Sequence, residues 1–117
     1  MRRFFPLVLA AVVSPFLLGA GCGGEIAFHG SGGGEDKSEY SCRQGAELKV
    51  TWRGESGSLT VTTYDPAAEV TQFTRTFVPT GVDQNFTQAF PGVSRYTVTV
   101  TRTSDWKGAY TVNLACK

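Results

Sequence analysis

Histidine, cysteine and long apolar runs are scarce in this chain, and each scarcity argues against a class of function. One histidine and three cysteines stand among 117 residues, and they do not cluster as zinc ligands do. The longest apolar stretch, residues 4–18, is interrupted by Pro6 and Pro15. It is shorter than the roughly 20 residues that a membrane-spanning helix needs. A zinc protein and a membrane-spanning helix are therefore both disfavoured.

Excess basic charge is also lacking. The chain has 11 Lys and Arg residues against 10 Asp and Glu residues, with a formal net charge of +1. A surface that follows a phosphate backbone needs a concentrated basic patch. We therefore expect no nucleic-acid partner.

No set of catalytic residues is evident. A serine hydrolase needs a histidine base, and His29 stands in a glycine-rich segment without fixed neighbours. Residues 54–58 look like a nucleophile elbow, but Ser58 stands where its closing glycine belongs. Four acidic residues lie in or near predicted turns, at spacings that match no calcium loop: Asp65, Glu69, Asp83 and Asp105. We expect no enzyme activity, no metal site and no cofactor.

The amino terminus has the layout of a secretory signal. Arg2 and Arg3 precede the apolar stretch 4–18, and small residues follow it. Cys22 comes directly after Ala20 and Gly21, an order that resembles the lipobox of bacterial lipoproteins. In that family the cysteine becomes the lipidated first residue of the mature chain. The resemblance implies a signal peptide over residues 1–21 and a fatty acid such as palmitate on Cys22.

Two other interpretations remain open. Ordinary cleavage near Ala20 would give a secreted protein with a free thiol at Cys22, and an uncleaved segment would give an anchor helix. The lipoprotein interpretation places the protein in the bacterial cell envelope, attached to a membrane through its lipid. Gly23, rather than an aspartate, follows Cys22, and in this family that favours the outer membrane.

Cysteine pairing gives separate support to this interpretation. If Cys22 carries lipid, Cys42 and Cys116 remain as a pair in an oxidising compartment. Cys116 is also in phase with Leu114 along a predicted strand, and Cys42 is in phase with Leu48. We therefore predict a Cys42–Cys116 disulfide.

The segment after Cys22 is rich in glycine and charge. Residues 30–34 include four glycines, and residues 35–39 are mostly charged. This composition is typical of flexible linkers. The predicted organisation is a lipidated cysteine with a flexible tether over residues 22–41, followed by one small domain over residues 42–117.

From Cys42 onward, apolar residues alternate with polar residues, many of them threonine. This period of two is typical of half-buried antiparallel strands. The apolar series are Leu48, Val50 and Trp52; Leu59 and Val61; Tyr96, Val98 and Val100; and Tyr110, Val112 and Leu114. Turn residues separate the runs, and residues 104–108 are expected to close the last hairpin. We predict an all-β fold, a small antiparallel β-sandwich of six or seven strands.

Two stretches carry a second resemblance. Residues 96–100 followed by residues 106–112 look like the closing hairpin of pre-peptidase C-terminal-type domains, which are small secreted bacterial β-sandwiches. Residues 59–66 are similar to the central strand and turn of those domains. The acidic residues that usually precede that strand are replaced here by Ser56, Gly57 and Ser58, so a calcium role is not carried over.

Exposed aromatic residues are the remaining hint of binding. Trp106 lies between Asp105 and Lys107 in a predicted turn, and it is a candidate ligand contact together with Tyr64. We expect a non-enzymatic binding or structural module of the cell envelope, whose partner is an unidentified envelope protein or glycan. The alternative is a secreted or surface carbohydrate-binding accessory domain.

Overall fold

Eight antiparallel strands make up the described chain, where the sequence predicted six or seven. The structure, a computed structural model, describes residues 23–92 and 94–117. The strands are β1 (Gly24–Ser31), β2 (Gly34–Cys42), β3 (Ala46–Ser56), β4 (Leu59–Asp65), β5 (Val70–Phe77), β6 (Gln84–Phe90), β7 (Ser94–Arg102) and β8 (Lys107–Cys116). The predicted all-β class and antiparallel sandwich are confirmed.

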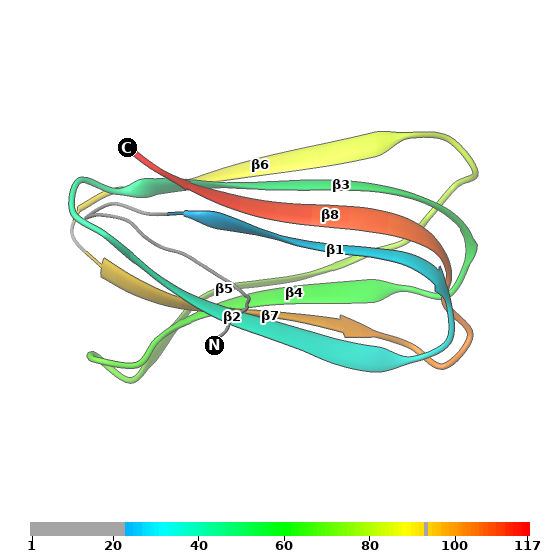
Figure 1. Ribbon diagram of the computed structural model, residues 1–117, viewed down its shortest axis with the longest axis horizontal. Helices are drawn as coiled ribbons and strands as arrows, with labels where there is room; N and C mark the ends of the chain where they lie inside the picture. The colour runs from blue at the N-terminus through cyan, green and yellow to red at the C-terminus, as the bar shows by residue number, and fades with distance from the viewer. Residues whose placement is uncertain (1–22, 93) are drawn as a thin grey trace, which may run out of the picture.

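The strands form two facing sheets of four, in the orders β1-β8-β3-β6 and β2-β7-β4-β5 (Figure 1). This order is that of an eight-stranded jelly roll built from two Greek keys. Strands β4 and β5 are joined as a hairpin, whereas β7 and β8 lie in different sheets. The expected hairpin at residues 104–108 is therefore wrong. Turn residues mark where a strand ends, but they do not decide which sheet the next strand joins.

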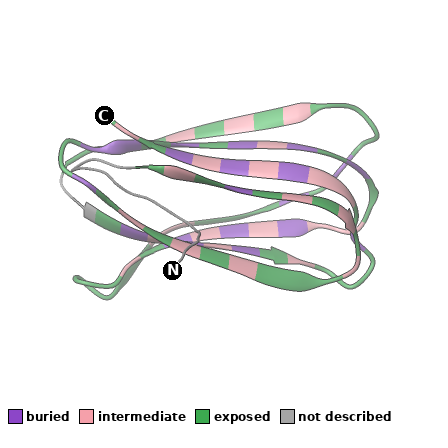
Figure 2. Cartoon of the chain, in the orientation of Figure 1, coloured by how far each residue is buried: buried purple, intermediate pink, exposed green. Residues whose placement is uncertain are grey.

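The core lies between the two sheets and follows the predicted alternation. The buried positions form regular bands along the strands (Figure 2). The central strands β3, β8, β4 and β7 supply most of them, including Leu48, Val50, Val112, Leu114, Leu59, Val61, Val98 and Val100, each at most 1% exposed. Burying aliphatic side chains of this size stabilises a fold by about 1.5–3 kcal/mol each.

Threonines cover the outer face of the β2-β7-β4-β5 sheet. Thr60 pairs with Thr76 and Thr62 with Thr74 across β4 and β5. Their hydroxyl oxygens lie 2.9 Å and 3.0 Å apart, within hydrogen-bond distance. Cross-strand threonine pairs of this kind each stabilise a sheet by a few tenths of a kcal/mol.

The predicted tether is wrong for most of its length, because β1 and β2 occupy residues 24–31 and 34–42. Ile26 is 7% exposed and joins the core, and Phe28 packs against it. β1 pairs with β8 along its whole length, and β2 does the same with β7. The predicted signal peptide and Cys22 lie outside the described residues.

The glycines that suggested flexibility form the turn between β1 and β2. Gly32 has a φ of 104°, which disfavours residues with a side chain. Its N–H donates to the Trp106 carbonyl over 2.8 Å. A Cβ on Gly33 would lie 3.1 Å from the Ser104 Cα. Here glycine allows a close approach of two backbones.

Candidate functional site

A shallow depression lies on the outer face of the β1-β8-β3-β6 sheet. It has a volume of about 350 Å³ and is lined in part by Thr51, Ala109 and Thr111. These small side chains come from the neighbouring strands β3 and β8, where Thr51 pairs with Thr111. Arg53 and Asp83 also line it, and their charged atoms lie 3.5 Å apart.

A second hollow of about 280 Å³ adjoins the first and shares Arg53 and Ala109 with it. His29, Glu55 and three glycines complete its lining: Gly54, Gly81 and Gly108. Gly54 and Gly108 pair across β3 and β8, and a Cβ on Gly108 would collide with the Arg53 carbonyl. Missing side chains therefore help to create this hollow.

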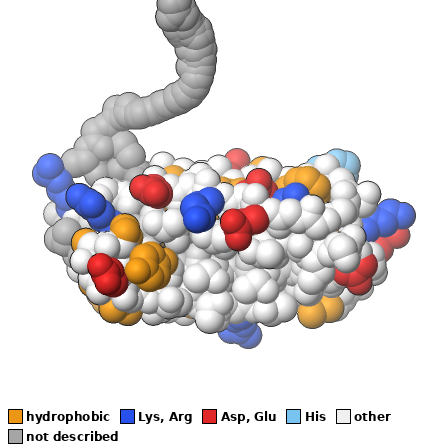
Figure 3. Space-filling model, turned by 90° about the horizontal axis from the view of Figure 1, so that it is seen from below, with side chains coloured by type: hydrophobic (Ala, Val, Ile, Leu, Met, Phe, Trp, Pro, Cys, Tyr) orange, Lys and Arg blue, Asp and Glu red, His pale blue; other side chains and the backbone are white. Residues whose placement is uncertain are grey.

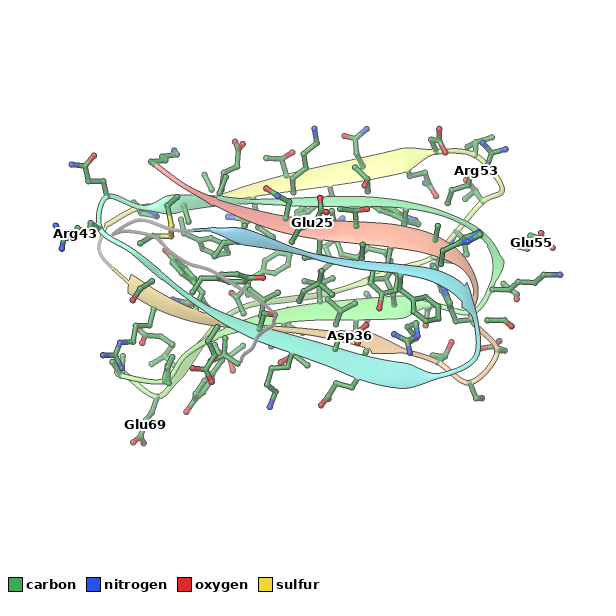
Figure 4. All side chains as sticks on the ribbon, viewed as in Figure 1. Glu25, Asp36, Arg43, Arg53, Glu55 and Glu69 are labelled. Carbon is green, nitrogen blue, oxygen red and sulfur yellow. A yellow bond between two sulfur atoms is a disulfide. The ribbon has the colours of Figure 1, made fainter. Side chains whose placement is uncertain are left out.

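The combined depression offers hydrogen-bonding groups and charges of both signs. Arg53 and Asp83 are highly exposed, at 64% and 84% of their side chains. An ion pair this exposed contributes about 0–1 kcal/mol, so either group can exchange its partner for a ligand at little cost. Figure 4 shows Arg53 and Glu55 at one end of the sandwich, with Arg43 and Glu69 at the other.

A second polar cluster lies between the sheets and joins β2, β7 and β8. Arg102 Nη1 donates to Asp36 Oδ2 over 2.9 Å and to the Tyr110 hydroxyl over 2.8 Å. The Tyr110 hydroxyl donates in turn to Asp36 Oδ2 over 2.9 Å. The Arg102 guanidinium also lies 3.7 Å from the centre of the Phe28 ring, a cation–π contact.

This cluster changes how its members bind protons. Burial raises the pKa of Tyr110 to about 12, against an ordinary value of 10.0. Burial opposes the charge on Arg102, but hydrogen bonds and charges of Tyr110 and Asp36 outweigh it and raise the Arg102 pKa. The guanidinium stays charged and Tyr110 stays protonated at neutral pH. The cluster is a structural one, whose members hydrogen-bond to one another across three strands. The alternation of apolar and polar residues in the sequence did not indicate it.

Trp106 is not a surface contact, and its predicted exposure is wrong. Its side chain is 1% exposed, and its indole N–H donates to the Gly108 carbonyl over 3.2 Å. The ring lies edge-on to Tyr110, with 5.8 Å between centroids. The turn containing Trp106 folds inward at the open end of the sandwich, where a large ring fills the space between sheets.

Tyr64 is 36% exposed, as a contact residue should be. It pairs with Thr97 and Thr71 in the β2-β7-β4-β5 sheet. The depression lies on the other sheet, so the two candidate features do not form one site. Asp65, the next residue, accepts the Ala67 N–H over 2.9 Å and shapes the hairpin turn.

The hydroxyl of Ser56, in the segment that looks like a nucleophile elbow, donates to the Asp105 carbonyl over 2.7 Å. This contact joins two loops at one end of the sandwich. Among residues 23–92 and 94–117, no three His, Cys, Asp or Glu side chains gather as metal ligands would. The same residues contain no helix long and apolar enough to cross a membrane.

The predicted Cys42–Cys116 disulfide is confirmed. It joins the ends of β2 and β8, with Cα atoms 5.3 Å apart. These strands belong to different sheets, so the bond ties the two layers together at the end where Arg43 lies (Figure 4).

Comparison of the chain with protein families, curated proteins and solved structures gave no match.

Proposed function

We propose that this protein is a lipid-anchored bacterial envelope protein whose jelly roll is a non-enzymatic binding or structural module. The observation that carries the proposal is the bond between Cys42 and Cys116. It accounts for two of the three cysteines and leaves Cys22, directly after a signal-like segment, as the cysteine available for lipid. An envelope location also suits a disulfide, which persists in oxidising compartments.

The structure adds a geometric argument about how an anchored domain would stand. β1 begins at Gly24, so one residue, Gly23, separates it from Cys22. Gly24 pairs with Leu114, near the end of β8 that carries Cys116. A lipid on Cys22 would therefore hold that end of the sandwich close to the membrane. The depression near Arg53 and Glu55 would face away from it, open to a partner.

A carbohydrate-binding accessory domain is the second candidate. The depression favours it, because Thr51, Thr111, Arg53 and Asp83 can exchange hydrogen bonds with sugar hydroxyls. The aromatic platform expected from Trp106 is buried, which weakens this candidate. A glycan array with the purified protein would distinguish it from a protein-binding module.

Replacement of Cys22 tests the anchor. We expect Cys22→Ser to abolish incorporation of a fatty-acid analogue and to release the protein from membranes, because no thiol remains for lipid attachment. Metabolic labelling and fractionation measure both effects. In an organism with two membranes, we expect the unaltered protein in the outer one.

Cys116→Ala is the matched control, since it also removes one cysteine but leaves Cys22 in place. It should retain the label. Label that persists in Cys22→Ser, or that is missing from the unaltered protein, would contradict the lipid anchor. A labelled protein found in the inner membrane would contradict the sorting alone.

A further inference from the structure

The two sheets end in four edge strands, β1, β6, β2 and β5. Edge strands present unpaired backbone groups and tend to pair with other chains unless charge, proline or a bulge prevents it. β2 carries Glu35, Lys37 and Glu39 on its exposed positions, and β1 carries Glu25. β5 carries Arg75, and a bulge interrupts its pairing with β4. Three of the edges are thus protected.

β6 has none of these protections. Its sequence from Gln84 to Phe90 is QNFTQAF, with no charged residue, proline or glycine. It pairs with β3 in continuous register from Trp52 to Ala46, without a bulge. Short segments with β-forming residues, no charge and no proline are those that readily add a further strand.

The geometry also keeps β6 ready for pairing. Phe86 stacks on Phe73 with 5.7 Å between ring centroids, and the Arg75 guanidinium lies 4.5 Å from its ring centre. These contacts fix the inward face of the strand. The Gln88 side chain donates to the Ala89 carbonyl over 3.0 Å. A backbone N–H of an added strand can replace this flexible side-chain amide as the donor to that carbonyl.

We propose that β6 is a self-association edge, where a second copy of this chain pairs antiparallel to β6 and joins two four-stranded sheets into one of eight. The favoured register is centred on Thr87, because a two-fold axis brings the same residue of each copy together. Asn85 then lies opposite Ala89, and the flanking Asp83 lies opposite Pro91. No charged residue faces another along the seam.

Charges further from the seam permit the same pairing. Lys49 is the neighbour of Thr87 on β3, so the two copies of Lys49 would be three strand spacings apart, about 14 Å. Repulsion over that distance is largely screened at physiological salt. A second copy fits this edge because it offers the same uncharged strand, whereas β1, β2 and β5 would each bring charge to it.

A lysine at the centre of the proposed β6–β6 pairing tests whether the two copies associate there. The full chain, purified in a mild detergent, should show a concentration-dependent dimer by sedimentation. Thr87→Lys should weaken dimerisation at least tenfold, because it places two ammonium groups directly opposite one another. Thr71→Lys is the matched control: it is an exposed threonine on the β5 edge, with the same change in charge, and should dimerise normally.

Covalent trapping checks the register and covers the case where lysine disturbs folding. In a Cys22→Ser background, Thr87→Cys should form an intermolecular disulfide under mild oxidation, because directly opposed Cβ atoms lie about 4.5–5.5 Å apart. Thr71→Cys in the same background should not. A parent chain that stays monomeric, or equal cross-linking of both variants, overturns the proposal. Neither result bears on lipid attachment at Cys22, which the labelling experiment decides.

Discussion

Arg102 shows how single residues close one side of this sandwich. It lies at the end of β7, and its side chain reaches Asp36 on β2 and Tyr110 on β8. Its Nε also donates to the Gly32 carbonyl over 3.2 Å, in the turn between β1 and β2. The Arg102 side chain is 10% exposed, and each of its contacts comes from a different element. Breaking one contact would leave buried polar groups with fewer partners, which is costly.

The pKa of Tyr110 predicts a loss of stability at high pH. The folded value is about 12 and the ordinary value is 10.0. The proton on Tyr110 is therefore held more tightly in the folded state. Its contribution is complete below pH 10 and is lost as the pH rises towards 12, by at most roughly 3 kcal/mol. Chemical unfolding between pH 8 and pH 12 measures this decline.

Tyr110→Phe should flatten that decline, and it should lower the free energy of unfolding at pH 7 by about 1–2 kcal/mol through its lost hydrogen bonds. Tyr64→Phe, at an exposed tyrosine, is the control and should leave the profile unchanged. An unaltered pH profile in Tyr110→Phe would show that another group causes the decline.

At the scale of elements, β1 and β2 matter most because they are formed by residues that the sequence predicted to be a flexible linker. β1 covers β8 and completes one sheet, and β2 completes the other by pairing with β7. Outward charges on β2 alternate with the inward Asp36 and Tyr40. Burial raises the pKa of Tyr40, as expected for a side chain inside the fold. The strands that follow residue 22 are therefore part of the domain.

Ile26→Ala tests whether β1 belongs to the cooperative fold. Ile26 is 7% exposed and pairs with Val112. Its truncation should lower the free energy of unfolding by about 2–4 kcal/mol, through lost burial and a cavity. Urea denaturation measures the change. Glu25→Ala, one residue earlier on the same strand, should change stability by less than about 0.5 kcal/mol. Equal, negligible effects of both variants would mean that the segment is a tether after all.

At the scale of the whole molecule, the domain has a sparsely charged surface and is stabilised by the Cys42–Cys116 disulfide. Figure 3 shows acidic and basic side chains scattered over one face, with wide uncharged areas between them. The Cys42–Cys116 bond spans a sequence separation of 74 residues and connects the two sheets. By loop entropy, a bond over this length stabilises the fold by about 4 kcal/mol. A domain of fewer than 100 residues has a small core and gains much from such a bond.

Cys116→Ala should therefore lower the free energy of unfolding by about 2–4 kcal/mol. The melting temperature should fall by about 10 °C or more. Calorimetry under non-reducing conditions measures the fall, and reduction of the unaltered protein should reproduce it. In denaturant, which exposes the buried Cys42, this thiol should react with maleimide in the variant. Reactive Cys42 in the oxidised, unaltered protein would show that the bond is not formed in solution.

Local sequence patterns predicted those strands whose alternation of apolar and polar residues is complete within one segment. Leu48 and Val50, or Val98 and Val100, alternate with polar residues along one strand. This alternation can be recognised without knowing which strand lies beside it. The Cys42–Cys116 bond was predicted from the cysteine count and from the phase of Cys116 with Leu114 on β8. The phase of Cys42 with Leu48 was wrong as an argument, because Cys42 ends β2 and Leu48 lies on β3 in the other sheet. Trp106 was not, because its burial depends on Gly32 and Tyr110, which come from other parts of the chain.

The sequence alone determined an all-β chain, the inward face of most strands and the pairing of two cysteines. These properties are local, or follow from a count. Only the tertiary structure decided which strands are neighbours, that Gly32 and Gly33 form a tight turn, and that Asp36, Arg102 and Tyr110 meet. Each of these depends on strand pairing over tens of residues, and the energy of such pairing resides in contacts that no single segment contains.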